Sequence, residues 1–276
     1  EPAAGVVARR MSSESQLAEN PWSLQMHRQN YLLPVTFNPS PNQAPFQGPT
    51  RDGGPQFPEM DETEAKFQLS VKLPVVRNLF GIGTLYAAYT GTSWWQVYNK
   101  EVSAPFRETN HEPELFLAMP TGWQAAGFRL PVVSVGLVHE SNGRAQPLSR
   151  SWNRIYAEFV AERGNLALSF KPWYRLPESK KQDPMEADGD DNPDITDYLG
   201  HFELGAAWRI KDDVLRAQLR RNFRKGNGGL ELSWSHPLRS NLKLFTQYYQ
   251  GYGESLIDYN DYTHRIGVGV SFGDVL

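Results

Sequence analysis

The chain of 276 residues contains no cysteine, which excludes disulfides, thiolate metal sites and a cysteine nucleophile. It also has little surplus charge: 28 basic and 31 acidic side chains leave a net charge of −3, which gives no indication of a nucleic-acid partner. Only 39% of residues are hydrophobic, and the charge-free stretch 78–99 is rich in Gly, Thr and Tyr. No segment therefore predicts a membrane-spanning helix.

What the sequence does contain favours strands. Aromatic residues reach 12%, and the chain has 23 glycines and 20 prolines, which suit strands and turns better than helices. In 66–75, apolar residues at odd positions alternate with polar or small residues at even positions, and 165–171 and 265–272 repeat the pattern. Such an alternation is typical of a strand with one apolar and one polar face.

About twelve such segments follow one another, and their connections alternate in length. The segments start near residues 30, 66, 83, 111, 129, 151, 165, 198, 213, 227, 241 and 264. Short links at one end of the strands and long loops at the other are typical of an outer-membrane barrel. We therefore predict an all-β fold, a twelve-stranded antiparallel transmembrane β-barrel of the outer membrane. Residues 1–29 form an irregular N-terminal segment in this prediction, and 30–276 form a single barrel domain.

A large soluble β-sandwich or a lipocalin-like barrel also has alternating strands and is an alternative. The polar face of the segments argues against it, because Arg154, Glu158 and Lys171 suit a charge-networked lumen better than a packed apolar core. Aromatic residues near strand ends predict interfacial girdles; they are Trp94, Trp95, Trp152, Trp173, Tyr174, Trp208 and Trp234. Some of these could equally be ordinary core aromatics.

Three polar side chains interrupt one apolar strand face. His139 and Ser141 share the apolar face of the strand that starts near 129, and Asn153 lies on the apolar face of the next strand. An unpaired polar group on a lipid-facing surface costs free energy, so function or mutual hydrogen bonding should explain the three. A serine hydroxyl needs an imidazole to accept its proton, and the imidazole needs a third group to fix its tautomer. The amide oxygen of Asn153 can do this.

The sequence around these residues resembles bacterial outer-membrane phospholipase A. The resemblance rests on His-Glu-Ser-Asn-Gly-Arg at 139–144 and Ser-Arg-Ser-Trp-Asn-Arg at 149–154, and it extends to the segments 93–96, 105–110, 191–196 and 251–260. It implies a twelve-stranded barrel that hydrolyses acyl esters of phospholipids and lysophospholipids, requires calcium and is activated by homodimerisation. It also implies a place in the outer membrane of a Gram-negative bacterium, with the active site toward the outer leaflet.

By the same resemblance, Ser141 is the nucleophile, His139 the general base and then acid, and Asn153 the orienting partner. The resemblance places calcium near the oxyanion, held by oxygens at Ser103 of the partner subunit, Arg144 and Ser149, with Asp191 at a second site. Calcium prefers several oxygen ligands, and the many carboxylates of 178–197 could attract it, although such an acidic loop is more often simply solvated.

Three positions depart from the family pattern. Glu140 replaces the more usual aspartate and is expected to point into the lumen. Gln146 replaces an acidic calcium ligand, which weakens the case for the second calcium site. Gly91 replaces a glutamine that hydrogen-bonds across the dimer.

The alternative function is a passive outer-membrane pore or lipid-uptake barrel in which the three residues are not functional, and its expected mark is a wide aqueous lumen.

Overall fold

The computed structural model describes residues 5–17, 23–47, 59–101, 103–183, 185–186, 188–239 and 241–273. Its elements, in chain order, are α1 Val6–Leu17, β1 Gln25–Met26, β2 Asn30–Phe37, the 3-10 helix η1 Ala44–Phe46, β3 Thr63–Leu79, β4 Gly83–Trp95, β5 Phe106–Ala125, β6 Phe128–Ser141, β7 Ser151–Arg163, β8 Leu166–Arg175, α2 Ile195–Leu199, β9 Phe202–Ile210, β10 Asp213–Asn222, β11 Asn227–Arg239, β12 Leu242–Tyr252 and β13 Tyr262–Phe272.

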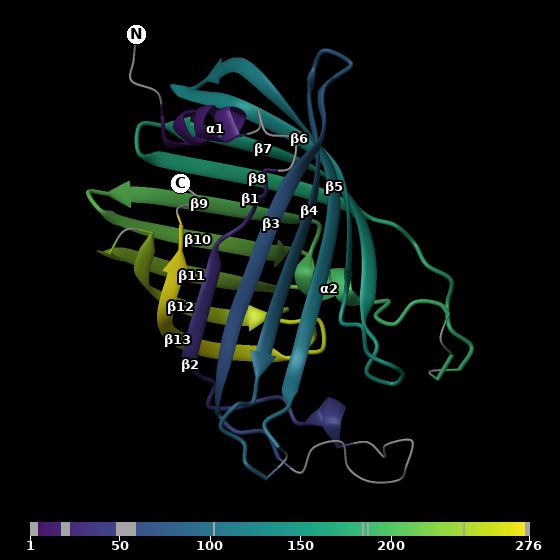
Figure 1. The fold of residues 1–276 in the computed structure, drawn as a ribbon. Helices are drawn as coiled ribbons and strands as arrows, with labels where there is room; N and C mark the ends of the chain where they lie inside the picture. Colours follow the sequence, from purple (N-terminus) through teal and green to yellow (C-terminus); the bar gives the residue numbers. More distant parts are fainter. Residues whose placement is uncertain are drawn as a thin grey trace.

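The strands form one closed antiparallel sheet (Figure 1). From β2 to β13 each strand pairs with the next along the chain, and β2 also pairs with β13, which closes the barrel. The short β1 pairs with β3 at Gln25 and Lys72, beyond the part of β3 that pairs with β2, so β1 and β2 together serve as the first strand. The predicted twelve-stranded antiparallel barrel is confirmed.

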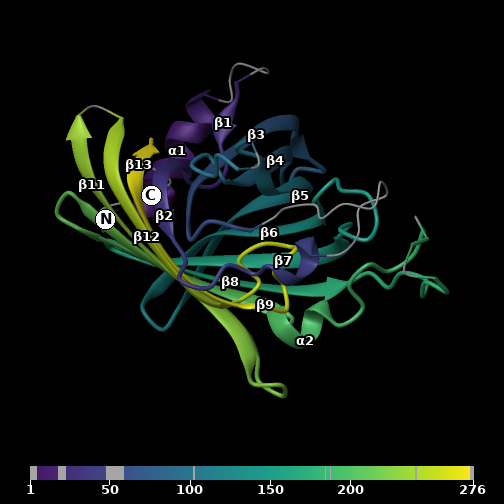
Figure 2. The same cartoon turned by 90° about the horizontal axis from the view of Figure 1, so that it is seen from below.

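The connections separate into two rims. Tight turns join β3 to β4, β5 to β6, β7 to β8 and β9 to β10, whereas long connections follow β2, β4, β6, β8 and β12 at the other rim. The helix α2 belongs to the long connection between β8 and β9, as Figure 2 shows. This asymmetry matches the predicted arrangement of an outer-membrane barrel.

The outer wall of the barrel is apolar. Side chains that point outward from the strands leave large hydrophobic groups exposed, including Leu69, Val135, Leu137, Ile155, Phe170, Leu204, Leu232 and Ile266. Inward-pointing neighbours on the same strands are buried, and they include the polar Ser70, Ser134 and Arg154 as well as the apolar Val138 and Tyr156. Alternation with period two therefore gives each strand a lipid-facing and a lumen-facing side.

Two charge networks cross the lumen. In the first, Arg107 binds Glu64 at 3.0 Å and Asp258 at 2.5 Å, and Arg265 bridges Glu64 to Glu254, both at 2.8 Å. In the second, Glu114 binds Arg28 at 2.6 Å and lies 3.6 Å from Lys171, while Arg154 binds Glu140 at 2.6 Å. The predicted lumen residues Arg154 and Lys171 thus have the partners that buried charges require.

The expectation of an irregular segment over 1–29 is wrong for Val6–Leu17, which forms α1, and for Gln25–Met26, which forms β1. The helix has a weak apolar periodicity, so its sequence did not reveal it. Its stability comes from packing inside the barrel, where Val6 and Val7 contact Ala167 and the Glu162 carboxylate accepts the Val7 backbone N–H at 2.8 Å.

The aromatic-girdle prediction is wrong for Trp94, Trp152 and Trp173, which are buried inside the barrel. Trp152 donates to Glu140 and has the Arg154 guanidinium stacked on its ring. Strand parity explains this, because nearness to a strand end does not tell which face a side chain occupies. Trp208 and Tyr174, in contrast, are exposed on the outer wall.

Candidate active site on the outer wall

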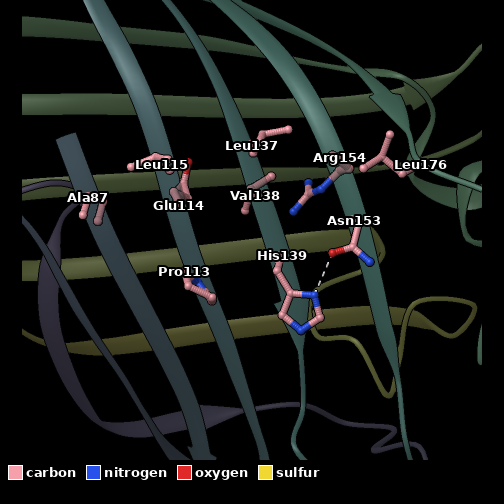
Figure 3. A pocket seen from close by; sticks show the side chains of 11 residues that line it. Ala87, Pro113, Glu114, Leu115, Leu137, Val138, His139, Asn153, Arg154 and Leu176 are labelled. Carbon is pink, nitrogen blue, oxygen red and sulfur yellow. Dashed lines mark hydrogen bonds between the residues drawn. The ribbon is translucent and has the colours of Figure 1, made fainter. Parts of the chain in front are cut away.

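Two paired strands bring His139 and Asn153 together. His139 in β6 lies directly opposite Asn153 in β7, and the two side chains share a hydrogen bond of 2.9 Å between Nδ1 and Oδ1 (Figure 3). His139 is exposed and Asn153 is partly exposed. Both point outward from the barrel, away from the lumen. The register of the strands therefore forms the imidazole–amide pair that the sequence suggested.

Ser141 ends β6 and occupies the same outward face as His139, two residues further along. It lies opposite His111 in β5 and opposite Ser151 in β7. The long-loop rim begins at this point of the wall. The three predicted residues therefore lie together on two adjacent strands, at the end of the barrel where the long loops gather.

A carboxylate on the loop after β8 orients the amide of Asn153. Asn153 Nδ2 donates to Glu178 Oε1 at 3.3 Å, and the Leu176 backbone N–H donates to the Asn153 carbonyl at 2.8 Å. The first contact fixes the amide so that Oδ1 faces His139. Sequence reasoning placed Glu178 only among the acidic loop residues, because its distance along the chain hides this contact.

Glu140 lies between the two outward residues of β6 and points into the lumen, as expected. Its carboxylate accepts from Trp152 at 2.9 Å and from Arg154 at 2.6 Å. These contacts join the wall that carries His139 to the second lumen network. The departure from the family pattern at this position thus leaves the outward face unchanged.

Sequence reasoning missed two further polar residues on this face. Tyr89 in β4 and His111 in β5 also point outward, and the Tyr89 hydroxyl lies 2.6 Å from His111 Nδ1. On the same strands Ser93 and Thr109 share a hydrogen bond of 3.0 Å. The alternation along the strand could have shown this for His111, because it lies four positions before Leu115 and therefore on the same outward face.

An apolar groove of about 490 Å³ adjoins the pair. Outward side chains from β4 to β7 line it, among them Ala87, Pro113, Leu115, Leu137, His139 and Asn153, together with Leu176 from the loop (Figure 3). The groove is open toward the region that lipid would occupy. It places hydrocarbon-compatible surface directly beside the imidazole.

Oxygen-bearing side chains gather on the loops nearby. Ser149 donates to Asp191 at 2.6 Å, Gln146 donates to the same carboxylate at 2.7 Å, and Lys181 forms an ion pair with it. Burial raises the pKa of Asp191, but the hydrogen bonds from Lys181, Ser149 and Gln146 outweigh it and hold this pKa below its ordinary value. Two of the four predicted metal ligands, Ser149 and Asp191, are therefore in contact.

The other two lie apart from this contact. Arg144 binds Glu108 at 3.2 Å through Nε and the carbonyls of β5 through its terminal nitrogen, so only its backbone carbonyl suits a cation. Ser103 is exposed, with a φ of 60°, on the loop between β4 and β5. Among the described residues, no cluster of three or more His, Cys, Asp or Glu side chains could hold a metal ion. A calcium site here would draw on hydroxyl, amide and carbonyl oxygens, which calcium accepts.

In the part of the chain that the structure describes, no helix has the length and apolar character needed to cross a membrane.

Comparisons with known proteins identify the family of this chain. The family model described as Phospholipase A1 matches residues 7–272. Phospholipase A1 of Escherichia coli K12 is 47% identical over 213 residues, which cover 77% of this chain and 70% of the relative.

Two solved structures share the fold. Outer membrane phospholipase A from Escherichia coli superposes with a TM-score of 0.83 at 40% identity, covering 92% of this chain and all of that one. The Salmonella typhi outer membrane phospholipase, described as a dimer with bound calcium, gives the same score and identity over 93% of this chain and 94% of its own. The chain therefore belongs to the phospholipase A1 family, the outer-membrane phospholipases of Gram-negative bacteria.

Proposed function

We propose that this member of a phospholipid ester hydrolase family is a calcium-dependent phospholipase that uses Ser141, His139 and Asn153 as its catalytic residues. The hydrogen bond between His139 Nδ1 and Asn153 Oδ1, on the lipid-facing wall, is the observation that carries the proposal. A carbonyl oxygen in this position accepts a hydrogen bond, so Nδ1 carries the hydrogen and Nε2 is left to accept a proton.

Ser141 then attacks the ester. Its Oγ bonds to the carbonyl carbon while its proton passes to His139 Nε2, and a tetrahedral intermediate forms. The intermediate collapses when His139 returns that proton to the leaving glycerol oxygen and the ester C–O bond breaks. Water releases the fatty acid from the acyl-serine by the same proton transfers. Asn153 stabilises the imidazolium through Oδ1 at each stage.

The location of the residues supports a lipid substrate. Ser141 and His139 face outward, beside the apolar groove, and the interior of the barrel lies on the other side of the wall. An acyl chain in the groove would place its ester near the rim, where the apolar wall meets the polar loops. The substrates we propose are phospholipids, hydrolysed at both acyl positions (A1 and A2), and lysophospholipids. The active site faces the outer leaflet.

Calcium would bind next to this site through the hydroxyl of Ser149, the carbonyl of Arg144 and Ser103 of the partner subunit, with Asp191 as a neighbouring carboxylate. When bound, calcium supplies a positive charge that stabilises the oxyanion. The calcium-bound dimer of the Salmonella typhi relative supports this part of the proposal. Activation by homodimerisation follows, since Ser103 comes from the second subunit.

The passive-pore alternative has less support. It needs a wide aqueous lumen, whereas the two charge networks and α1 occupy the interior of this barrel. Conductance in a planar bilayer separates the two functions, because sustained large channels would favour the pore.

The decisive experiment is acyl-ester hydrolysis in detergent micelles with excess calcium or with chelator. We expect activity from the parent protein with calcium only, and none above background from Ser141→Ala. Ser151→Ala, which removes a hydroxyl directly opposite in β7, is the matched control and should retain activity. A folded, dimeric parent that hydrolyses nothing would refute the phospholipase.

A further inference from the structure

A second histidine lies beside the proposed nucleophile. His111 in β5 and Ser141 in β6 are directly paired across the two strands. Their Cα atoms are therefore separated by roughly 5 Å, the spacing of an antiparallel pair. His111 approaches Ser141 from the opposite side to Asn153, since β6 lies between β5 and β7.

The surroundings hold the His111 ring in one place. The Tyr89 hydroxyl binds Nδ1 at 2.6 Å. A Cβ at position 91 would lie only 3.0 Å from that hydroxyl, so a glycine at this position leaves room for the Tyr89 side chain. On the other side, a Cβ on Gly143 would lie 3.9 Å from His111 Nε2, so this nitrogen faces the end of β6. Gly91, at which the chain departs from the family pattern, thus accommodates the Tyr89–His111 pair.

The tautomer and protonation state of His111 determine whether Nε2 donates or accepts a hydrogen bond. When the Tyr89 hydroxyl donates to Nδ1, the neutral ring carries its hydrogen on Nε2; when the ring is protonated, both nitrogens carry one. Nε2 is a donor in these two states, which a phosphate acceptor favours over the remaining tautomer, whose Nδ1–H donates to the tyrosine oxygen. Among the described residues, no protein group accepts a hydrogen bond from it. The carboxylates of Glu112 and Glu114, which both follow His111 in β5, point into the lumen and bind Arg28.

At this level, where the apolar wall meets the polar loops, His111 is half-exposed and its Nε2 is open to a ligand. A ligand that brings a charged acceptor to the position beside Ser141 would form a hydrogen bond with it. The ester that Ser141 attacks belongs to a molecule whose phosphate is attached to the same glycerol, a few bonds from the reacting carbon. We infer that His111, oriented by Tyr89, binds the phosphate of the phospholipid substrate through Nε2. This inference rests on the proposed function.

The test compares two substrates with identical acyl chains, a diacyl phosphatidylcholine and the corresponding diacylglycerol, in mixed micelles with calcium. His111→Phe keeps a ring of similar size but removes the donor. We expect it to lower kcat/KM for the phospholipid about ten- to hundredfold, the usual effect of losing a hydrogen bond to a charged group, and to leave the diacylglycerol unchanged. Tyr89→Phe should lower the phospholipid rate several-fold, and His111→Gln, which keeps an N–H donor, should retain part of it.

His264→Phe is the matched control. His264 also lies on the outer wall and also binds a tyrosine, Tyr248, at 3.2 Å, but it is on β13, remote from β6 in the sheet. It should leave both rates unchanged. Crosslinking of each variant reports the dimer fraction, and heat-modifiable migration on a gel reports folding.

The outcomes distinguish a failure of the phosphate inference from a failure of the proposed function. An equal loss on both substrates, with or without a loss of dimer, assigns His111 a packing or oxyanion role and overturns the phosphate inference, as does no loss at all. A p-nitrophenyl acyl ester serves as a second substrate without phosphate. A folded parent inactive on every substrate overturns the proposed function, and the inference with it.

Discussion

His139 Nδ1 and Asn153 Oδ1 lie 2.9 Å apart on directly paired residues of β6 and β7. Because the pair is part of the strand register, the barrel itself brings the two residues together, and Glu178 on the loop after β8 then orients the amide. Rigid elements hold catalytic groups more accurately than loops do. This relationship underlies the first two predictions.

Replacing Asn153 tests the orienting role. Asn153→Ala should lower kcat about 100- to 1000-fold, because His139 loses the acceptor that fixes its tautomer. Asn153→Asp keeps an acceptor oxygen and should retain far more activity. Micelle hydrolysis at saturating calcium measures both. Equal activity in the two variants would show that the side-chain oxygen does not orient His139.

Glu178 should act as a positioning residue. It accepts from Asn153 Nδ2, so Glu178→Ala should lower kcat several-fold while KM stays unchanged, and Glu178→Gln, which retains an acceptor, should restore most of the rate. Glu186→Ala in the same loop is the control. A change in KM alone would instead point to a contact with substrate.

Lys181 should weaken calcium binding. Its ammonium group forms an ion pair with Asp191, which neutralises the carboxylate nearest Ser149. Lys181→Met should lower the calcium concentration needed for half-maximal activity by about tenfold, which corresponds to about 1.4 kcal/mol. Direct calcium titration should show the same shift. Lys180→Met, at an exposed neighbour, should show none; an unchanged titration for Lys181→Met would exclude competition at Asp191.

The contacts of the Asp191 carboxylate should weaken at acid pH, when the carboxylate becomes protonated. Its pKa lies below the ordinary value of 3.8, so the unfolded or detached loop binds the proton more readily. The contacts therefore contribute fully above about pH 3.8 and weaken as the pH falls through the lower pKa of the folded state. Because the chain has no cysteine, a fluorescent label on Lys180→Cys would be unique. Its mobility should be constant from neutral pH to about pH 4 and rise below that.

The Asp191→Asn variant supplies the control for this titration. Its label mobility should not change with pH over the same range, since the amide does not titrate. A parent protein whose label loosens already between pH 7 and pH 5 would contradict the lowered pKa.

The barrel could be predicted closely from local pattern. The segment predicted near residue 83 begins at Gly83, and those near 213 and 227 begin at Asp213 and Asn227. A strand begins where the alternation of polar and apolar residues begins, and it ends where turn residues interrupt that alternation. The helix α1 could not be predicted in this way, because its packing partners, Ala167 and Glu162, are distant in the chain.

In the candidate site, too, some features could be predicted from the sequence and others could not. Parity along one strand is a local property, so the shared face of His139 and Ser141 was visible in the sequence, as was the outward parity of Asn153. The contacts with Glu178 and between Tyr89 and His111 depend on register and on the path of a loop, which no periodicity encodes.

The sequence by itself determined the alternation of faces, the number of strands and the residue types available for chemistry, because each depends on neighbours one or two positions apart. Only the tertiary structure decided which strands meet in which register. That register pairs His139 with Asn153, places His111 opposite Ser141 and buries Trp152 inside the lumen. The reason is physical: a barrel closes through hydrogen bonds between strands, and a shift of one residue would turn every side chain to the other face.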